Sequence, residues 1–259
     1  MADIRPGAEP ARLEGDADTA VLLIHGFTGS PASIHPWAES LHTNGYTVAV
    51  PRLPGHGTTW QDMERTTWQD WYAAAEQALD ELVGQYRQVY VGGLSMGGAL
   101  ALRLAEQRSA DVAGVMVVNP GVRRPDRTDV PILLALDRVG LLGPLTKVMP
   151  TVPGISNDIK KPGQDEVAYD QVPIKSGIQL LKLQEDVRGN LPQVTQPLMV
   201  FTAPEDHVAE PVNSDIVMTE TGSRRKTQVL LPESYHVATL DNDAQTIFAE
   251  SLEFILRHG

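Results

Sequence analysis

Cysteine is absent from the 259 residues of this sequence. Its absence excludes disulfide bridges, thiolate nucleophiles and zinc sites built from thiolates, and nothing points to an oxidising compartment. Hydrophobic residues make up 42% of the sequence and charged residues 21%, close to the averages of globular proteins. The chain can therefore bury a core without covalent cross-links.

The sequence is also poor in basic residues, since 21 Lys and Arg stand against 33 Asp and Glu and give a formal net charge of -12. Nucleic acids and anionic membranes select for basic surfaces, so we expect neither as a partner. The acidity is typical of a soluble surface.

Long apolar runs are missing as well. A membrane span needs roughly 18 uninterrupted apolar residues, whereas charged residues, glycines and a proline interrupt the most apolar region, residues 131–149. Residues 1–18 are polar and lack the apolar run of a signal peptide. We therefore predict a cytoplasmic protein without a transmembrane segment.

Short apolar runs rich in β-branched residues alternate with longer helical patterns along the chain. This alternation predicts an α/β fold in which helices cover both faces of a mostly parallel central sheet. The expected strands are residues 21–24, 47–50, 89–91, 115–118, 198–201 and 228–231. The expected helices are residues 34–44, 68–85, 97–107, 211–219 and 244–257.

Residues 121–191 break this alternation. They contain no convincing strand and are too many for an ordinary loop. Because α/β folds often run to about 200–250 residues as one unit, we predict a single domain over residues 1–259. A helical cap inserted at about 121–191 separates the two halves of its core.

A possible nucleophile lies in the pattern Gly93-Leu94-Ser95-Met96-Gly97. G-x-S-x-G occurs by chance, but here an expected strand precedes it and a helix-forming run follows. Flanking glycines allow the sharp, strained turn that exposes a serine hydroxyl at a helix N-terminus, where partial positive charge stabilises an oxyanion. We predict Ser95 as the nucleophile; the alternative is a glycine-rich turn whose serine only caps the helix.

A serine nucleophile needs a base, and in this type of fold the chain order is serine, acid, histidine. Three of the seven histidines follow Ser95. His236 lies in the loop between the last strand and the last helix, where it can reach the carboxyl edge of the sheet. His207 shares a loop with the candidate acid, and His258 follows the last helix, so we predict His236 as the base.

The acid is expected in the loop after residues 198–201. Asp206 is the preferred residue and Glu205 the alternative. The other position available to an acid, the end of the preceding strand, holds Asn119, which carries no charge. For Asp206 the competing interpretation is a turn residue ahead of the next helix.

The oxyanion needs two backbone donors, one after the nucleophile and one in the loop after an early strand. We predict the N–H groups of Met96 and Phe27. His25, in that early loop, precedes the nucleophile and is expected to brace the loop by hydrogen bonding. His56, in Pro54-Gly55-His56-Gly57, is interpreted as a turn residue.

Several further motifs make the chain resemble the bacterial monoacylglycerol lipases and the related small carboxylesterases of the α/β-hydrolase superfamily. They are HGFTGSP at 25–31, PRLPGHGT at 51–58, DMERTTWQDW at 62–71, GLSMGG at 93–98, EDHV at 205–208 and SYHVATLD at 234–241. The resemblance implies an α/β-hydrolase fold, a triad of Ser95, Asp206 and His236, and oxyanion amides on Phe27 and Met96.

The resemblance also extends to parts of the cap, at 155–158 and 165–170, while residues 123–149 match poorly. It implies that Ile155 touches substrate and that Glu166 contacts the glycerol hydroxyls. The apolar residues of the unmatched part form either a lid face that meets lipid or the core of the cap. They are Ile132, Leu133, Leu134, Leu136, Leu141, Leu142 and Leu145.

Together these features predict a serine carboxylic-ester hydrolase that releases fatty acid and glycerol from monoacylglycerols through an acyl-enzyme. One alternative is a generic carboxylesterase for short- to medium-chain esters, and another is a ligand-binding protein that kept the fold without catalysis. We expect no metal and no cofactor. The expected partner is a small-molecule ester, with transient contact of the cap with a lipid surface; the oligomeric state stays open.

Overall fold

A seven-stranded sheet in the order β1-β3-β2-β4-β5-β8-β9 forms the centre of the computed structural model. The structure describes residues 2–123 and 129–259, with residues 129–131 and 145 described by their backbone only. The strands are Ala11–Leu13 (β1), Thr19–Ile24 (β2), Thr47–Val50 (β3), Gln88–Leu94 (β4), Gly114–Val118 (β5), Leu198–Thr202 (β8) and Lys226–Leu230 (β9).

All neighbouring strands of this sheet are parallel except β1, which pairs antiparallel with β3 at the edge. The predicted mostly parallel sheet is confirmed, and each expected strand is present within a few residues. β1 was not predicted, because a three-residue segment with Arg12 at its centre has no apolar run to reveal it.

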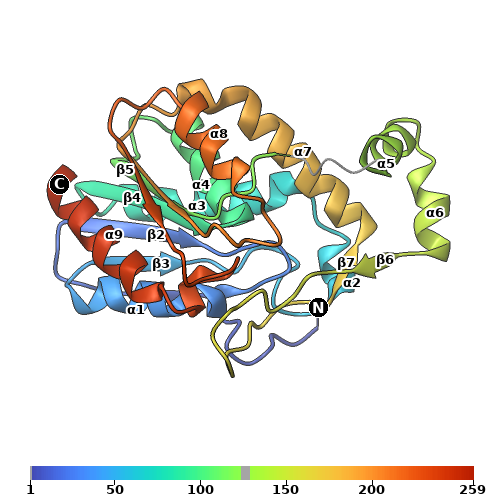
Figure 1. The fold of residues 1–259 in the computed structure, drawn as a ribbon, viewed down its shortest axis with the longest axis horizontal. Coiled ribbons are helices and arrows are strands. Elements are labelled where there is room, and N and C mark those ends of the chain that lie inside the picture. The colour runs from blue at the N-terminus through green and yellow to red at the C-terminus, as the bar shows by residue number, and fades with distance from the viewer. Residues whose placement is uncertain (1, 124–128) are drawn as a thin grey trace.

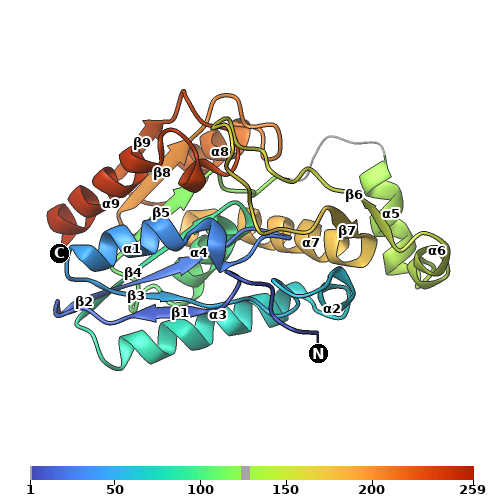
Figure 2. The ribbon, with the colours of Figure 1, turned by 90° about the horizontal axis from the view of Figure 1, so that it is seen from below.

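Helices cover both faces of the sheet, and each face has its own apolar core. α1 (His35–Thr43) and α9 (Ala244–His258) pack on one face. α3 (Trp68–Val83), α4 (Met96–Gln107) and α8 (Val212–Glu220) contribute to the core of the other face. Figures 1 and 2 show these layers on either side of the strands. The central strands are buried on both faces, which explains their continuous apolar sequences.

The chain leaves the sheet between β5 and β8. There it forms the helices α5 (Asp129–Arg138), α6 (Leu142–Val148) and α7 (Ile174–Asn190) and two short paired strands. α5 and α6 project at one end of the molecule (Figure 1), whereas α7 runs back along α4 and buries Leu183 and Val187 in the core of its face. The second half of the segment is therefore part of the layer that covers the sheet.

The expectation of no strand in residues 121–191 was wrong. β6 (Thr151–Pro153) pairs antiparallel with β7 (Gln171–Pro173). Each strand has three residues and ends in proline, which is confined to sheet edges because it lacks an N–H donor. Such short segments show no alternation of apolar and polar residues, so periodicity could not reveal them.

The apolar residues of α5 and α6 divide between two environments. Leu134 and Leu142 are buried and pack with residues of α7. Ile132 and Leu141 are 61% and 55% exposed. Leu134 and Leu142 thus form part of the cap core, as one interpretation of this run expected. The other interpretation, a lid face that meets lipid, stays a prediction for the exposed residues. The side chain of Leu145 lies outside the described residues.

Among the described residues, no helix combines the length and the apolar character needed to cross a bilayer. The cytoplasmic location stays a prediction.

The sheet passes directly from β4 into α4 at Ser95, whose φ of 57° lies in the left-handed region. A Cβ atom on Gly97 would overlap the backbone oxygen of Ile24, and one on Gly93 would overlap the backbone of Gly97. These close approaches need glycine at both positions. The turn at Ser95 is thus packed against the end of β2.

We predict that Gly97→Ala lowers the free energy of unfolding by about 1–3 kcal/mol or more, because the new methyl group meets backbone that cannot move aside. The change is measured by urea unfolding followed by circular dichroism. Gly189→Ala on α7 is the matched control, since a Cβ there meets no atom within 4 Å. It is expected to stabilise the protein by up to about 1 kcal/mol; equal effects of the two substitutions would contradict the packing at the turn.

Candidate active site

Ser95 is half-buried between the carboxyl ends of two strands. Its N–H donates to the carbonyl of Val118 at 2.9 Å, and its own carbonyl accepts from Gly121 at 3.2 Å. Both polar groups of its backbone are therefore held by the chain that leaves β5. This anchoring keeps the residue in its left-handed conformation at the start of α4.

His236 and Asp206 form a buried pair in the loops that follow β9 and β8. Nδ1 of His236 lies 2.7 Å from Oδ2 of Asp206, and the two side chains are only 9% and 1% exposed. Oδ1 of Asp206 accepts the N–H groups of Val208 and Ala209, each at 2.8 Å. We assign the proton of neutral His236 to Nδ1, facing the carboxylate, so Nε2 is the nitrogen that can accept a proton.

Glu205, the alternative acid, points elsewhere. Its side chain is 56% exposed and lies 3.7 Å from Nζ of Lys160. Of the two candidate acids, the structure places Asp206 against His236.

Asn119 links the loops that carry this pair. Its Oδ1 accepts the N–H of Ala203 at 2.8 Å, and its Nδ2 donates to the carbonyl of His236 at 2.8 Å. The residue itself has a φ of 44° directly after β5. In the sequence, Asn119 only excludes a carboxylate at the end of β5, because its bridging role depends on contacts between distant segments that no local pattern reveals.

The pKa of His236 reflects opposing effects. Burial alone would lower it, but the carboxylates of Asp206, Glu166 and Asp158 raise it above its ordinary value. A histidine acts as a base only when it is neutral. Activity that depends on His236 should therefore be lost as the pH falls through this raised pKa.

Loop 25–29 after β2 lies against Ser95. A Cβ atom on Gly26 would be 3.6 Å from Cβ of Ser95. Within the part of the chain that the structure describes, the N–H of Phe27 donates no hydrogen bond. Met96 is the first residue of α4, so its N–H has no partner within the helix. Both predicted oxyanion donors are thus available beside Ser95.

His25 braces this loop, as predicted. Its Nε2 accepts the N–H of Leu53 at 3.1 Å, so its proton lies on Nδ1, which is 2.9 Å from the carbonyl of Gly26. That carbonyl belongs to the same planar peptide group as the N–H of Phe27. The hydrogen bond to the carbonyl therefore also sets the direction of the Phe27 N–H. Burial lowers the pKa of His25 to about 4, which keeps the ring neutral. His56 packs against it, with ring centroids 5.1 Å apart.

The two substrate contacts implied for the cap lie in different surroundings. A Cβ atom on Gly29 would be 2.7 Å from Oε1 of Glu166, so this carboxylate faces loop 25–29. Burial raises the pKa of Glu166 to about 7, and the charge of His236 opposes the rise. Ile155 is 61% exposed on the surface of the cap.

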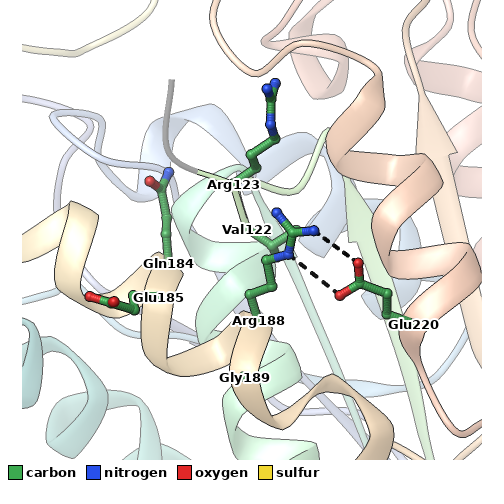
Figure 3. Close-up of a pocket in the computed structure, with 7 residues that line it drawn as sticks. All are labelled: Val122, Arg123, Gln184, Glu185, Arg188, Gly189 and Glu220. Atoms are coloured by element: carbon green, nitrogen blue, oxygen red, sulfur yellow. Dashed lines mark hydrogen bonds and ion pairs between the residues drawn. The ribbon is translucent and has the colours of Figure 1, made fainter. Parts of the chain in front are cut away.

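A separate cavity of about 520 Å³ lies between α7 and α8. Figure 3 shows its charged lining, in which the guanidinium of Arg188 pairs with Glu220 at 2.9 Å. None of the candidate catalytic residues lines it. The lining residues are Val122, Arg123, Gln184, Glu185, Arg188, Gly189 and Glu220.

The parallel sheet, the turn at Ser95 and the loops after β8 and β9 define an α/β-hydrolase. Residues 15–243 match the family described as serine aminopeptidase S33, which covers most of the chain. The chain belongs to this family.

Comparison with individual proteins indicates which type of bond the hydrolase cleaves. The chain is 41% identical to the thermostable monoacylglycerol lipase of Bacillus sp. (strain H-257), over 98% of this chain and 96% of that protein. It is 25% identical to a carboxylesterase of Bacillus subtilis (strain 168), over 95% and 96% of the two chains. The protein is a serine ester hydrolase.

Solved structures agree with this assignment. A structure from work on the metagenome-derived lipolytic enzymes LipS and LipT superposes with a TM-score of 0.91 and 38% identity, over 99% of this chain and 100% of that one. The monoacylglycerol lipase of Paleococcus ferrophilus superposes with a TM-score of 0.80 over 97% and 99% of the chains. At 19% identity this second likeness concerns the fold alone.

We predict that Asp206→Asn lowers kcat by roughly 10⁴-fold, because an amide no longer holds His236 in its productive tautomer. Glu205→Gln, the neighbouring control with the same change of group, should leave kcat close to the wild-type value. Initial rates on a water-soluble nitrophenyl ester measure both. Loss of activity in Glu205→Gln with retention in Asp206→Asn would reverse the assignment of the acid.

Proposed function

We propose that the protein hydrolyses monoacylglycerols to a fatty acid and glycerol through an acyl-enzyme on Ser95. The observation that carries the proposal is the carboxylate of Glu166, which lies near His236 and against loop 25–29 and makes no hydrogen bond to the described residues. The similarity to the Bacillus monoacylglycerol lipase over nearly the whole chain supports it.

In the first half of the reaction His236 removes the proton of the Ser95 hydroxyl, and Oγ attacks the ester carbonyl carbon. The N–H groups of Phe27 and Met96 donate to the oxyanion that forms. As the intermediate collapses, His236 gives its proton to the glycerol oxygen and the carbon–oxygen bond to glycerol breaks. In the second half His236 activates a water molecule, which releases the fatty acid and restores Ser95.

Asp206 supports both halves without changing its own protonation. Its two backbone donors hold one carboxylate oxygen while the other faces Nδ1 of His236. The carboxylate therefore stabilises the positive charge that His236 acquires in each half.

Glu166 gives the site a means of recognising the head group. An ionised carboxylate accepts hydrogen bonds from the two free hydroxyls of a monoacylglycerol. An ethyl ester of the same acid has no such hydroxyl and would leave the partly buried carboxylate without a partner. Sites built around a buried polar group discriminate strongly against ligands that cannot pair with it.

A carboxylesterase without head-group preference is the second candidate, supported by the similarity to the Bacillus subtilis carboxylesterase. Such an enzyme would act on glyceryl and ethyl esters alike. A non-catalytic protein would turn over neither.

We further propose that the cap meets the lipid surface from which a monoacylglycerol is taken. Val148 on α6 is 87% exposed and Leu141, just before α6, is 55% exposed; Val139 next to α5 is 67% exposed. With a net charge of -12 the chain gains nothing from anionic lipid. Contact would therefore rest on apolar burial and change little with salt.

We predict that the wild type strongly prefers a glyceryl ester to the ethyl ester of the same fatty acid, and that Glu166→Gln reduces this preference. A hydrogen bond to a charged group contributes about 1.5–3 kcal/mol, so kcat/KM for the glyceryl ester should fall by roughly 10- to 100-fold. The rate on the ethyl ester should change little. Both rates are measured on monomeric substrate.

Glu253→Gln, on the exposed face of α9, is the control for the change of charge. Ser95→Ala is the control for catalysis and should remove turnover of both esters while the protein stays folded. Equal kcat/KM for the two esters in the wild type would favour the carboxylesterase. Full activity of Ser95→Ala would overturn the mechanism.

We predict that Leu141→Ser with Val148→Ser weakens binding to phosphatidylcholine vesicles by about tenfold or more, since burying one such side chain contributes about 1.5–3 kcal/mol. Co-sedimentation measures binding, and hydrolysis of a short, soluble ester should be unchanged. Leu256→Ser on α9, where Leu256 is 75% exposed, is the matched control. Unchanged vesicle binding of the double variant would exclude the cap as the contact surface.

A further inference from the structure

A strap of the cap, residues 155–170, crosses the two loops that carry Asp206 and His236. It is attached on both sides of Glu166. Before Glu166, the N–H groups of Lys160 and Lys161 donate to the carboxylate of Asp241, which precedes α9, at 2.7 and 2.9 Å. After Glu166, the N–H of Tyr169 donates to the carbonyl of Thr28 in loop 25–29 at 3.0 Å. The strap is therefore bonded to two separate loops of the core.

Asp158 is the residue of the strap that reaches both loops. Its side chain is 10% exposed. One carboxylate oxygen, Oδ2, accepts the N–H of His236 at 3.1 Å and the N–H of His207 at 3.2 Å. Its backbone carbonyl accepts the N–H of Val237 at 3.1 Å. A single carboxylate oxygen thus joins the residue after Asp206 to His236 itself.

The second carboxylate oxygen of Asp158 is also occupied. Oδ1 lies 2.8 Å from Nδ1 of His207, whose ring packs on Tyr235 with centroids 4.6 Å apart. These contacts hold the carboxylate in one orientation. Charge-assisted hydrogen bonds of this kind are stronger than neutral ones.

The backbone of His236 is consequently held from two sides. Asn119 donates to its carbonyl, and Asp158 accepts from its N–H. Asn119 belongs to the sheet edge and Asp158 to the cap. Removing Asp158 would leave the loop of Asp206 and the loop of His236 joined by fewer hydrogen bonds. The bond of 2.7 Å between Nδ1 of His236 and Oδ2 of Asp206 would then be held less firmly.

We infer that Asp158 is a positioning residue for ester hydrolysis, whose carboxylate sets the spacing between the loop of Asp206 and the backbone of His236. This inference rests on the proposed function of the triad. On this inference the strap has two roles: it holds the loops of Asp206 and His236 in position, and it carries Glu166 to the substrate.

The charge of Asp158 has a second consequence. The charged groups that face His236 are Asp206 from the acid loop and Glu166 and Asp158 from the strap, and all three raise the pKa of His236 against the effect of burial. Replacing Asp158 by a neutral residue removes one of these charges. The acid limb of the pH profile should then move to lower pH, because His236 stays neutral to lower pH.

Two substitutions separate geometry from charge. In Asp158→Asn the amide oxygen still accepts both N–H groups, so kcat should stay within a few-fold of the wild type while the acid limb of kcat/KM moves to lower pH. In Asp158→Ala the oxygen that accepts both N–H groups is lost. Because small misplacements of catalytic groups slow the chemical step, kcat on a soluble ester should fall by about 10- to 100-fold with little change in KM. Asp170→Asn and Asp170→Ala are the controls, because Asp170 is exposed in the same strap.

The outcomes are distinct. Wild-type kcat in Asp158→Ala, an unmoved acid limb in Asp158→Asn, or equal losses in the two variants would each overturn the inference. If Asp158→Ala does not fold, the pH profile and kcat of Asp158→Asn decide alone. An inactive wild type, or an active Ser95→Ala, would instead overturn the proposed function. An active wild type with unaffected Asp158 variants would overturn only the role of Asp158.

Discussion

The close packing of the turn at Ser95 against the end of β2 is the constraint on which the site depends. Because Gly97 lies against the backbone of Ile24, α4 can begin directly after Ser95, with its N-terminus next to the end of β2. Strain in the left-handed Ser95 is sustained by the buried strands on both sides.

The remaining groups are brought to this turn by long-range bonds at the carboxyl edge of the sheet. Asn119 joins the loops after β5, β8 and β9, and His25 orients the peptide that carries the Phe27 N–H. Asp158 adds the strap of the cap to the same network. A hydrolase needs its acid, base and nucleophile within a fraction of an ångström of their working positions, and a network of short, buried hydrogen bonds is one way to achieve this.

Much of this arrangement could be predicted from the sequence, because the signals were local. Buried parallel strands give continuous apolar runs, and the glycines around Ser95 report a tight turn. The chain order of serine, acid and histidine then selected Asp206 and His236. In the structure, Oδ2 of Asp206 lies 2.7 Å from Nδ1 of His236.

What could not be predicted depends on short elements or on contacts between distant residues. β1, β6 and β7 have three residues each, too few for a periodic pattern. Asp158 is an ordinary acidic residue in the sequence, and its contacts appear only when residues 158, 207 and 236 are brought together. The division of the cap's apolar residues into buried and exposed sets likewise depends on how α5 and α6 pack on α7.

We propose that the turn after β4 and His236 together activate Ser95. A fluorophosphonate reacts covalently with an activated serine, and peptide mass spectrometry then locates the modified residue. We expect stoichiometric modification of Ser95 alone, at a rate that falls as the pH drops through the pKa of His236. An unlabelled Ser95, or labelling at another serine in the folded protein, would contradict it.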